Sequence, residues 1–135
     1  MVLRNLTALV AVSLLSSCAL YDAYMMTGYD PNEYRIIAEI RTDAYNSKQH
    51  CDNKLLSEAS AVAVADKTQL FEFYEEQIPR NNNGINASRE LNKIAQGLKR
   101  AYTTGPVSPT FCKLKFESIE HSAQTIQHVV GSRPR

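Results

Sequence analysis

Apolar residues recur every three or four positions between residues 32 and 78, a spacing typical of one face of an α-helix. Asp30 and Pro31 suit the N-cap and first position of this helix, and Pro79 ends it. The pattern predicts one helix of about 47 residues, and the alternative is a break between Asn46 and Asn53, where polar turn formers cluster. The apolar residues that form one stripe along this helix are Ile37, Ile40, Ala44, Cys51, Leu55, Ala59, Val62, Leu70 and Phe73.

Two shorter helices are predicted after a turn at residues 81–84. The first carries Ala87, Leu91 and Leu98 on one face and stops at Gly105. Ser108 and Pro109 open the second, whose apolar residues step by four and three. These residues are Cys112, Phe116, Ile119, Ala123, Ile126 and Val130. A short strand over residues 110–117 is the competing interpretation, but the helical seam is longer, so we expect an all-α bundle over residues 32–130 and an exposed tail over residues 131–135.

The first eighteen residues have the order of a targeting segment. Arg4 is followed by an apolar run over residues 6–15, which would be about 15 Å long as a helix and too short to span a membrane. Small residues then lead to Leu15-Ser16-Ser17-Cys18. Charge, apolar run and small residues in this order predict an N-terminal export signal.

Leu15-Ser16-Ser17-Cys18 resembles the lipobox of bacterial lipoproteins, which are cleaved before the cysteine and acylated on it. The resemblance implies a signal peptide over residues 1–17, palmitate and further acyl chains on Cys18, and a tether over residues 18–31. Ala19 implies transfer to the outer membrane, with the protein facing the periplasm. The alternative is an ordinary cleaved signal with an incidental cysteine. In the tether, Tyr21 and Tyr24 either rest on the bilayer surface or pack on the folded domain.

Charge limits the range of partners. The full chain carries a net charge of +1, and removal of residues 1–17 takes away Arg4 and leaves a net charge of zero. A neutral chain has no long-range attraction for nucleic acid or for anionic lipid headgroups. We therefore expect a membrane attachment through lipid and no nucleic-acid partner.

If Cys18 carries lipid, Cys51 and Cys112 remain as an even number of cysteines in an oxidising compartment. Both fall on the apolar stripes of their predicted helices, and helix and loop lengths allow them to meet. A disulfide between Cys51 and Cys112 is therefore predicted.

Other chemistry has weaker support. The adjacent residues His50, Cys51 and Asp52 point in different directions on a helix. His121 and His128 share a face with Glu117, but the spacing matches no familiar zinc motif. Because the sequence holds no Gly-rich phosphate loop and no nucleophile–base pattern, we expect no metal, no cofactor and no enzyme activity.

The predicted long helix would leave residues 32–50 without a partner inside the molecule. Its stripe of Ile36, Ile37, Ile40 and Ala44 would then be exposed and would bind a helix of another envelope protein. The expected function is a protein-interaction lipoprotein of the cell envelope, in general plan similar to the outer-membrane spanin subunits of phage lysis. The alternatives are a lipoprotein that excludes superinfecting phage and a module that binds a small ligand or lipid. The pattern does not determine the oligomeric state.

Overall fold

The computed structural model describes residues 27–135, and in this part of the chain the predicted all-α fold is confirmed. Within residues 27–135, four α-helices and one short 3-10 helix follow one another. Their bounds are Pro31–Ser47 for α2, Lys48–His50 for the 3-10 helix η1, Lys54–Glu76 for α3, Asn82–Thr104 for α4 and Pro109–Gly131 for α5. Among these helices, none is long and apolar enough to cross a membrane.

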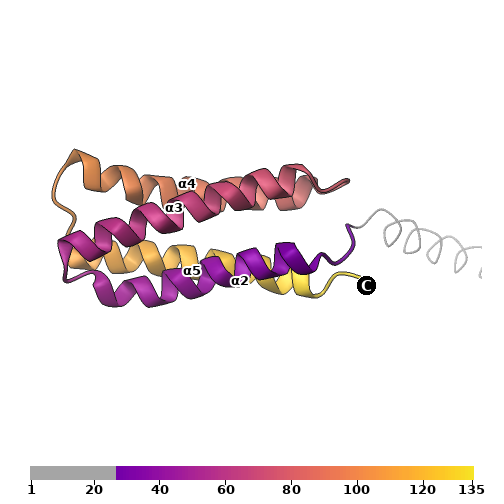
Figure 1. The fold of residues 1–135 in the computed structure, drawn as a ribbon, viewed down its shortest axis with the longest axis horizontal. Helices are drawn as coiled ribbons and strands as arrows, with labels where there is room; N and C mark the ends of the chain where they lie inside the picture. The colour runs from indigo at the N-terminus through magenta and orange to yellow at the C-terminus, as the bar shows by residue number, and fades with distance from the viewer. Residues whose placement is uncertain (1–26) are drawn as a thin grey trace, which may run out of the picture.

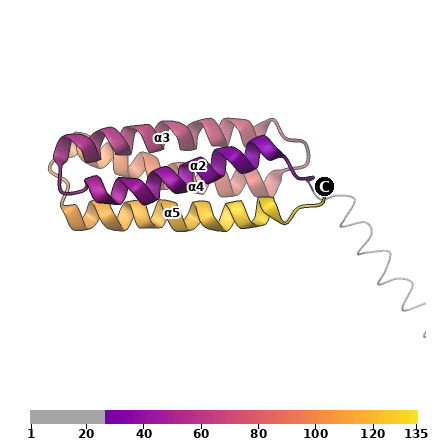
Figure 2. The same ribbon diagram turned by 60° about the horizontal axis from the view of Figure 1, so that its bottom comes forward.

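The helices form an up-down-up-down bundle (Figure 1). Each helix packs beside the next one along the chain, and α5 closes the ring by packing beside α2. Short connections favour this arrangement because they place successive helices antiparallel to one another. The C-terminus and the start of the described chain lie at the same end as the α3–α4 connection, and the α2–α3 and α4–α5 connections lie at the other end (Figures 1 and 2).

The prediction of a single long helix is wrong. The helix breaks between Asn46 and Asn53, as the alternative prediction proposed. After Ser47 the backbone tightens into η1, and Asn53 then takes an extended conformation with φ −116° and ψ 112°. Its side-chain oxygen accepts a hydrogen bond from Leu56 N at 3.1 Å and so caps a new helix. The chain reverses direction there, and α2 packs as one of the four helices of the bundle.

This reversal overturns the predicted partner surface. The stripe of Ile36, Ile37, Ile40 and Ala44 is buried, with exposed fractions between 0% and 6%. It was expected to lack an intramolecular partner, but α2 packs against both α5 and α3. These four residues belong to the core and cannot meet another protein without unfolding.

The break also changes which face of α3 is buried. The predicted core positions Leu55, Val62, Leu70 and Phe73 are exposed. The buried face consists of Ser57, Ala61, Val64, Ala65, Thr68, Phe71 and Glu75. The prediction carried one helical phase across residues 46–53, whereas a turn of irregular backbone resets the phase of the helix that follows it.

The remaining helices match the pattern. Residues 110–117 are helical, and Ser108 caps α5 by accepting a hydrogen bond from Phe111 N at 3.1 Å. Cys112, Phe116, Ile119, Ala123 and Val130 of the predicted seam are all buried. The tail differs from expectation at Arg133, because its side chain is only 8% exposed and lies against α2.

Candidate functional site

The predicted lipidation site, Cys18, lies outside the described residues, as do Tyr21 and Tyr24. The described chain begins at Thr27, whose hydroxyl donates to the Arg80 carbonyl at 2.7 Å. Tyr29 N donates to the Pro134 carbonyl at 2.9 Å. The last residues of the predicted tether are therefore attached to one end of the bundle.

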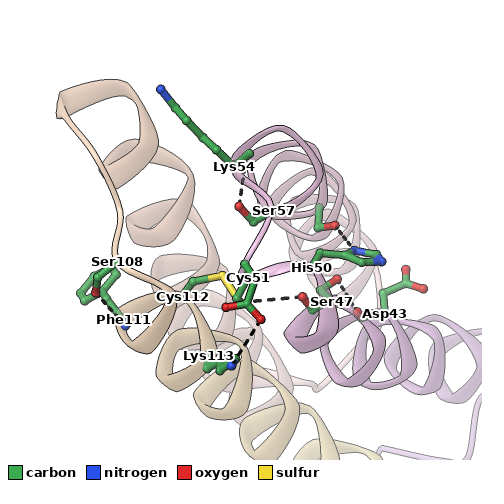
Figure 3. The surroundings of a disulfide bond; sticks show 12 residues. Asp43, Ser47, His50, Cys51, Lys54, Ser57, Ser108, Phe111, Cys112 and Lys113 are labelled. Atoms are coloured by element: carbon green, nitrogen blue, oxygen red, sulfur yellow. Dashed lines mark hydrogen bonds and ion pairs between the residues drawn. A yellow bond between two sulfur atoms is a disulfide. The ribbon is translucent and has the colours of Figure 1, made fainter.

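The predicted disulfide between Cys51 and Cys112 is present, with the two Cα atoms 5.7 Å apart. It joins the α2–α3 junction to the first turn of α5, and both cysteines are buried (Figure 3). The two cysteines are 61 residues apart in the sequence, so the bond closes a long loop. It therefore cross-links the helices at the end of the bundle opposite Thr27 and the C-terminus.

The residues beside Cys51 do not form a ligand cluster. His50 Nδ1 lies 2.8 Å from Ser60 Oγ, while Asp52 forms an ion pair with Lys113 at 3.8 Å (Figure 3). Cys51 is committed to the disulfide. His121 and His128 are both exposed on α5. Within residues 27–135, no three His, Cys, Asp or Glu side chains are grouped to hold a metal ion.

One apolar surface stands out on the bundle, and we call it the outer α3 face. Leu55 is 78% exposed there, Leu70 56% and Phe73 55%. These residues are spaced along one side of a straight helix, opposite the buried side that carries Val64 and Phe71. The outer α3 face comprises Leu55, Leu56, Ala59, Val62, Ala63, Leu70 and Phe73, all exposed.

The second unusual feature is a group of buried polar side chains at the end of the bundle near the termini, which we call the carboxyl cluster. It contains Glu33 of α2, Glu75 of α3, Asn81 and Arg133. Arg133 Nη1 donates to Glu33 Oε2 at 2.6 Å, and Arg133 Nη2 donates to Asn81 Oδ1 at 3.3 Å. The amide of Asn81 donates in turn to Glu75 Oε2. Four segments of the chain are thus joined by charge-assisted hydrogen bonds.

With both carboxyl groups ionised and the guanidinium charged, this cluster would carry a net charge of −1. One bound proton would make it neutral. Burial, and then the adjacent Glu75, raise the pKa of Glu33 to about 8, although Arg133 opposes the shift. The Oε1 atoms of Glu33 and Glu75 are both buried without a hydrogen-bond partner among the described residues. With its pKa at about 8, Glu33 holds a proton near neutral pH, and this proton brings the charge of the cluster to zero.

Asp30 stands beside this cluster and stays ionised. It caps α2 by accepting hydrogen bonds from Asn32 N and Glu33 N, and the Tyr74 hydroxyl donates to its other oxygen at 2.8 Å. Burial would raise the pKa of Asp30, but these hydrogen bonds and the charge of Arg133 outweigh burial and hold the pKa below its ordinary value. The ionised carboxyl group of Asp30 and the protonated carboxyl group of Glu33 are therefore only three residues apart in the sequence.

The sequence pattern did not identify the carboxyl cluster. In the sequence, Glu33 lies near the start of a helix, where a carboxylate suits the helix dipole, and Glu75 lies with Glu72 and Glu76 in an acidic group typical of a solvated face. Glu75 does share a helical phase with Thr68 and Phe71, and that spacing is a usable signal once α3 has its correct buried face. No signal along the chain connects Glu33 with Arg133, which lie 100 residues apart.

Comparison of the chain with protein-family models, with curated proteins and with solved structures found no match. Its function must therefore be inferred from its own residues.

Proposed function

We propose that this chain is a lipid-anchored periplasmic protein of the outer membrane, and that its four-helix bundle is a protein-interaction module. The anchor rests on the lipobox-like sequence that ends at Cys18. The attachment of residues 27–29 to one end of the bundle supports this interpretation, because it sets the distance between the lipid and the bundle. Residues 19–26 reach at most about 28 Å when fully extended, so the bundle stays close to the bilayer.

The observation that carries the interaction role is the outer α3 face. Leu, Val and Phe side chains lie exposed along about 27 Å of one helix, measured from Leu55 to Phe73. Asp66 and Gln69 interrupt this surface, but monomeric proteins rarely leave so many large apolar side chains on one helix face in water unless they bind something. A straight amphipathic surface of this kind fits an apolar helix of a protein partner.

The anchor is tested by metabolic labelling with a palmitate analogue in Gram-negative cells. The wild-type chain is expected to incorporate the label and to fractionate with the outer membrane. Cys18→Ala is expected to lose both properties because the acylated sulfur is gone. Label retained by Cys18→Ala, or a wild-type chain that stays unlabelled, would refute the lipoprotein interpretation.

The interaction surface is tested by cross-linking intact cells and purifying the chain. Phe73→Asp is expected to lose the cross-linked partner, since a charge replaces the apolar contact. Leu114→Asp on α5 is the matched control because Leu114 is 59% exposed but lies on another helix. If both variants keep the same partner, the outer α3 face has no role in binding. An inner-membrane partner would support the narrower, spanin-like role in lysis.

A further inference from the structure

Residues 27–29 and residues 132–135 lie side by side at one end of the bundle, and we call this pair of segments the clasp (Figures 1 and 2). Their backbones are joined by the hydrogen bond from Tyr29 N to the Pro134 carbonyl at 2.9 Å. The guanidinium of Arg135 lies 4.8 Å from the centre of the Tyr29 ring, a cation–π contact. Segments from opposite ends of the described chain therefore hold one another.

One buried side chain fastens the clasp to the helices. Arg133 donates from Nη1 to Glu33 in the first turn of α2 and from Nη2 to Asn81 in the α3–α4 connection. The Arg133 side chain is 8% exposed, and Glu33 is fully buried. Charge-assisted hydrogen bonds of a guanidinium are stronger than neutral ones, so Arg133 is the main attachment of residues 132–135.

The other attachments of the clasp are at the surface. The Thr27 hydroxyl donates to the Arg80 carbonyl, and this hydrogen bond is exposed. No apolar side chain of residues 27–29 or 132–135 belongs to the buried core, so the core keeps its contacts when these segments detach. Segments with few buried apolar contacts open at a lower free energy than the helices they lie on.

Withdrawal of Arg133 does not leave a bare carboxylate behind. The charge of Arg133 lowers the pKa of Glu33, and that pKa still stands at about 8. Glu33 is therefore protonated near neutral pH, and it holds its proton more firmly once Arg133 has left. The guanidinium itself moves into water. The carboxyl cluster thus tolerates the loss of its one cation.

We propose that the clasp opens while the four helices stay packed, and that opening releases residues 27–29 from the bundle and lengthens the tether. Arg133 holds the clasp shut. Three released residues add about 10 Å to the tether when they are extended. This inference rests on the proposed lipid-anchored module, because the length of that segment then limits how far the bundle lies from the bilayer.

Opening also changes the point at which the chain is fixed to the bundle. With the clasp closed, the first fixed residue of the described chain is Thr27. With the clasp open, it is Asp30, which remains the N-cap of α2 and accepts from the Tyr74 hydroxyl at 2.8 Å. An open clasp therefore lets the bundle turn about Asp30 and meet a partner farther from the bilayer.

Hydrogen exchange of the full chain in detergent micelles, resolved by residue with NMR, tests the opening. The Tyr29 amide is expected to be protected in the wild type, and its exchange should respond little to low urea, because local opening exposes little surface. The buried Phe116 amide should exchange only by global unfolding and accelerate with urea. An unprotected Tyr29 amide would overturn the closed clasp. Tyr29 exchange that follows Phe116 at every urea concentration would overturn its independent opening.

Arg133→Gln tests what holds the clasp shut. Exchange of the Tyr29 amide should become at least about tenfold faster, while circular dichroism shows intact helices. Arg35→Gln is the matched control, because the Arg35–Glu39 pair lies on the same helix as Glu33 but is exposed. A Tyr29 rate in Arg133→Gln that equals the control rate would overturn the role of Arg133.

Arg135→Ala keeps the test decisive if Arg133→Gln fails to fold, because it leaves the carboxyl cluster untouched. Loss of its cation–π contact should speed Tyr29 exchange about two- to fivefold. A wild-type rate in Arg135→Ala would overturn the part that Arg135 plays in closing the clasp.

Cys18→Ala separates the clasp from the lipid anchor. Its Tyr29 exchange should equal that of the wild type, since the acyl chains take no part in the contacts of the clasp. Independent Tyr29 exchange in a chain that incorporates no palmitate label would support the opening but overturn both the lipid anchor and the tether role of the clasp. A labelled chain whose Tyr29 exchange follows Phe116 would overturn the clasp alone.

Discussion

Glu33 and Glu75 place two carboxyl groups where both are fully shielded from water. The raised pKa of Glu33 means that the folded chain holds a proton that the unfolded chain releases near the ordinary carboxyl pKa of 4.5. The stabilisation is complete below that ordinary pKa and is lost as the pH rises toward about 8. Unlike most acidic residues, Glu33 therefore makes the fold weaker as the pH rises.

Glu75→Gln is expected to weaken this pH dependence, because Glu75 contributes to the raised pKa of Glu33 whereas the burial of Glu33 remains. The amide removes the neighbouring carboxyl charge that raises the pKa of Glu33, while the amide oxygen can still accept from Asn81. Urea unfolding between pH 5 and pH 9 should show that wild-type stability falls by up to about 1.4 kcal/mol per pH unit, the slope for one proton. Glu75→Gln should show a flatter profile, and the exposed neighbour Glu76→Gln should follow the wild type. Parallel profiles for wild type and Glu75→Gln would show that Glu75 does not raise the pKa of Glu33.

Gly84 is the other residue on which the carboxyl cluster depends. A Cβ there would overlap the side-chain oxygens of Asn81 and Glu75. Gly84→Ala is expected to destabilise the fold by about 1–3 kcal/mol, because a packed site must shift to admit the methyl group. Gly97→Ala is the matched control in the same helix, since a Cβ at that residue would have no neighbour within 4 Å. We expect Gly97→Ala to stabilise by about 0.5–1 kcal/mol, and chemical unfolding measures both effects.

At the scale of the elements, the α2–α3 junction is held by a helix cap and by a disulfide. Asn53 starts α3, and the Cys51–Cys112 disulfide holds the junction against the start of α5. The bond joins the two ends of a long loop, so it acts mainly by limiting the unfolded chain.

Thiol titration of the unreduced protein is expected to find no free thiol at Cys51 or Cys112. Replacement of both by Ser should lower the free energy of unfolding by up to about 4 kcal/mol, the entropy of closing a loop of this length. Urea unfolding of the oxidised wild type and the double variant measures the difference. Two titratable thiols in the native protein, or equal stabilities, would refute a stabilising bridge.

At the scale of the whole molecule, burial separates the core from the outer α3 face. Ile40→Ala is expected to cost roughly 2–5 kcal/mol, because Ile40 is fully buried between α2 and its neighbours. Leu55→Ala should change stability by no more than about 0.5 kcal/mol, because Leu55 is largely in water. Thermal or urea unfolding measures both values. A large loss for Leu55→Ala would place Leu55 in a contact within the monomer and would argue against a free outer α3 face.

Much of the local structure was predictable from the sequence. Asp30 with Pro31 and Ser108 with Pro109 mark two helix starts, because an oxygen-bearing side chain satisfies free N–H groups and proline loses nothing at the first position. The seam from Cys112 to Val130 identified the buried side of α5 because a helix repeats its face every three to four residues. The pairing of Cys51 with Cys112 followed from cysteine count and helix faces.

Tertiary structure decided the rest. A helical pattern fixes a face only up to the next break, so the phase of α3 depended on the turn at residues 48–53 and not on the stripe before it. The same turn brought α2 onto α5 and buried Ile37 and Ile40, and it left Leu55 and Phe73 outside. Glu33, Glu75 and Arg133 met only through packing, because contacts between residues many positions apart leave no periodic trace along the chain. Local hydrogen bonding and periodicity are properties of the sequence, whereas the choice of which apolar face is covered belongs to the assembled bundle.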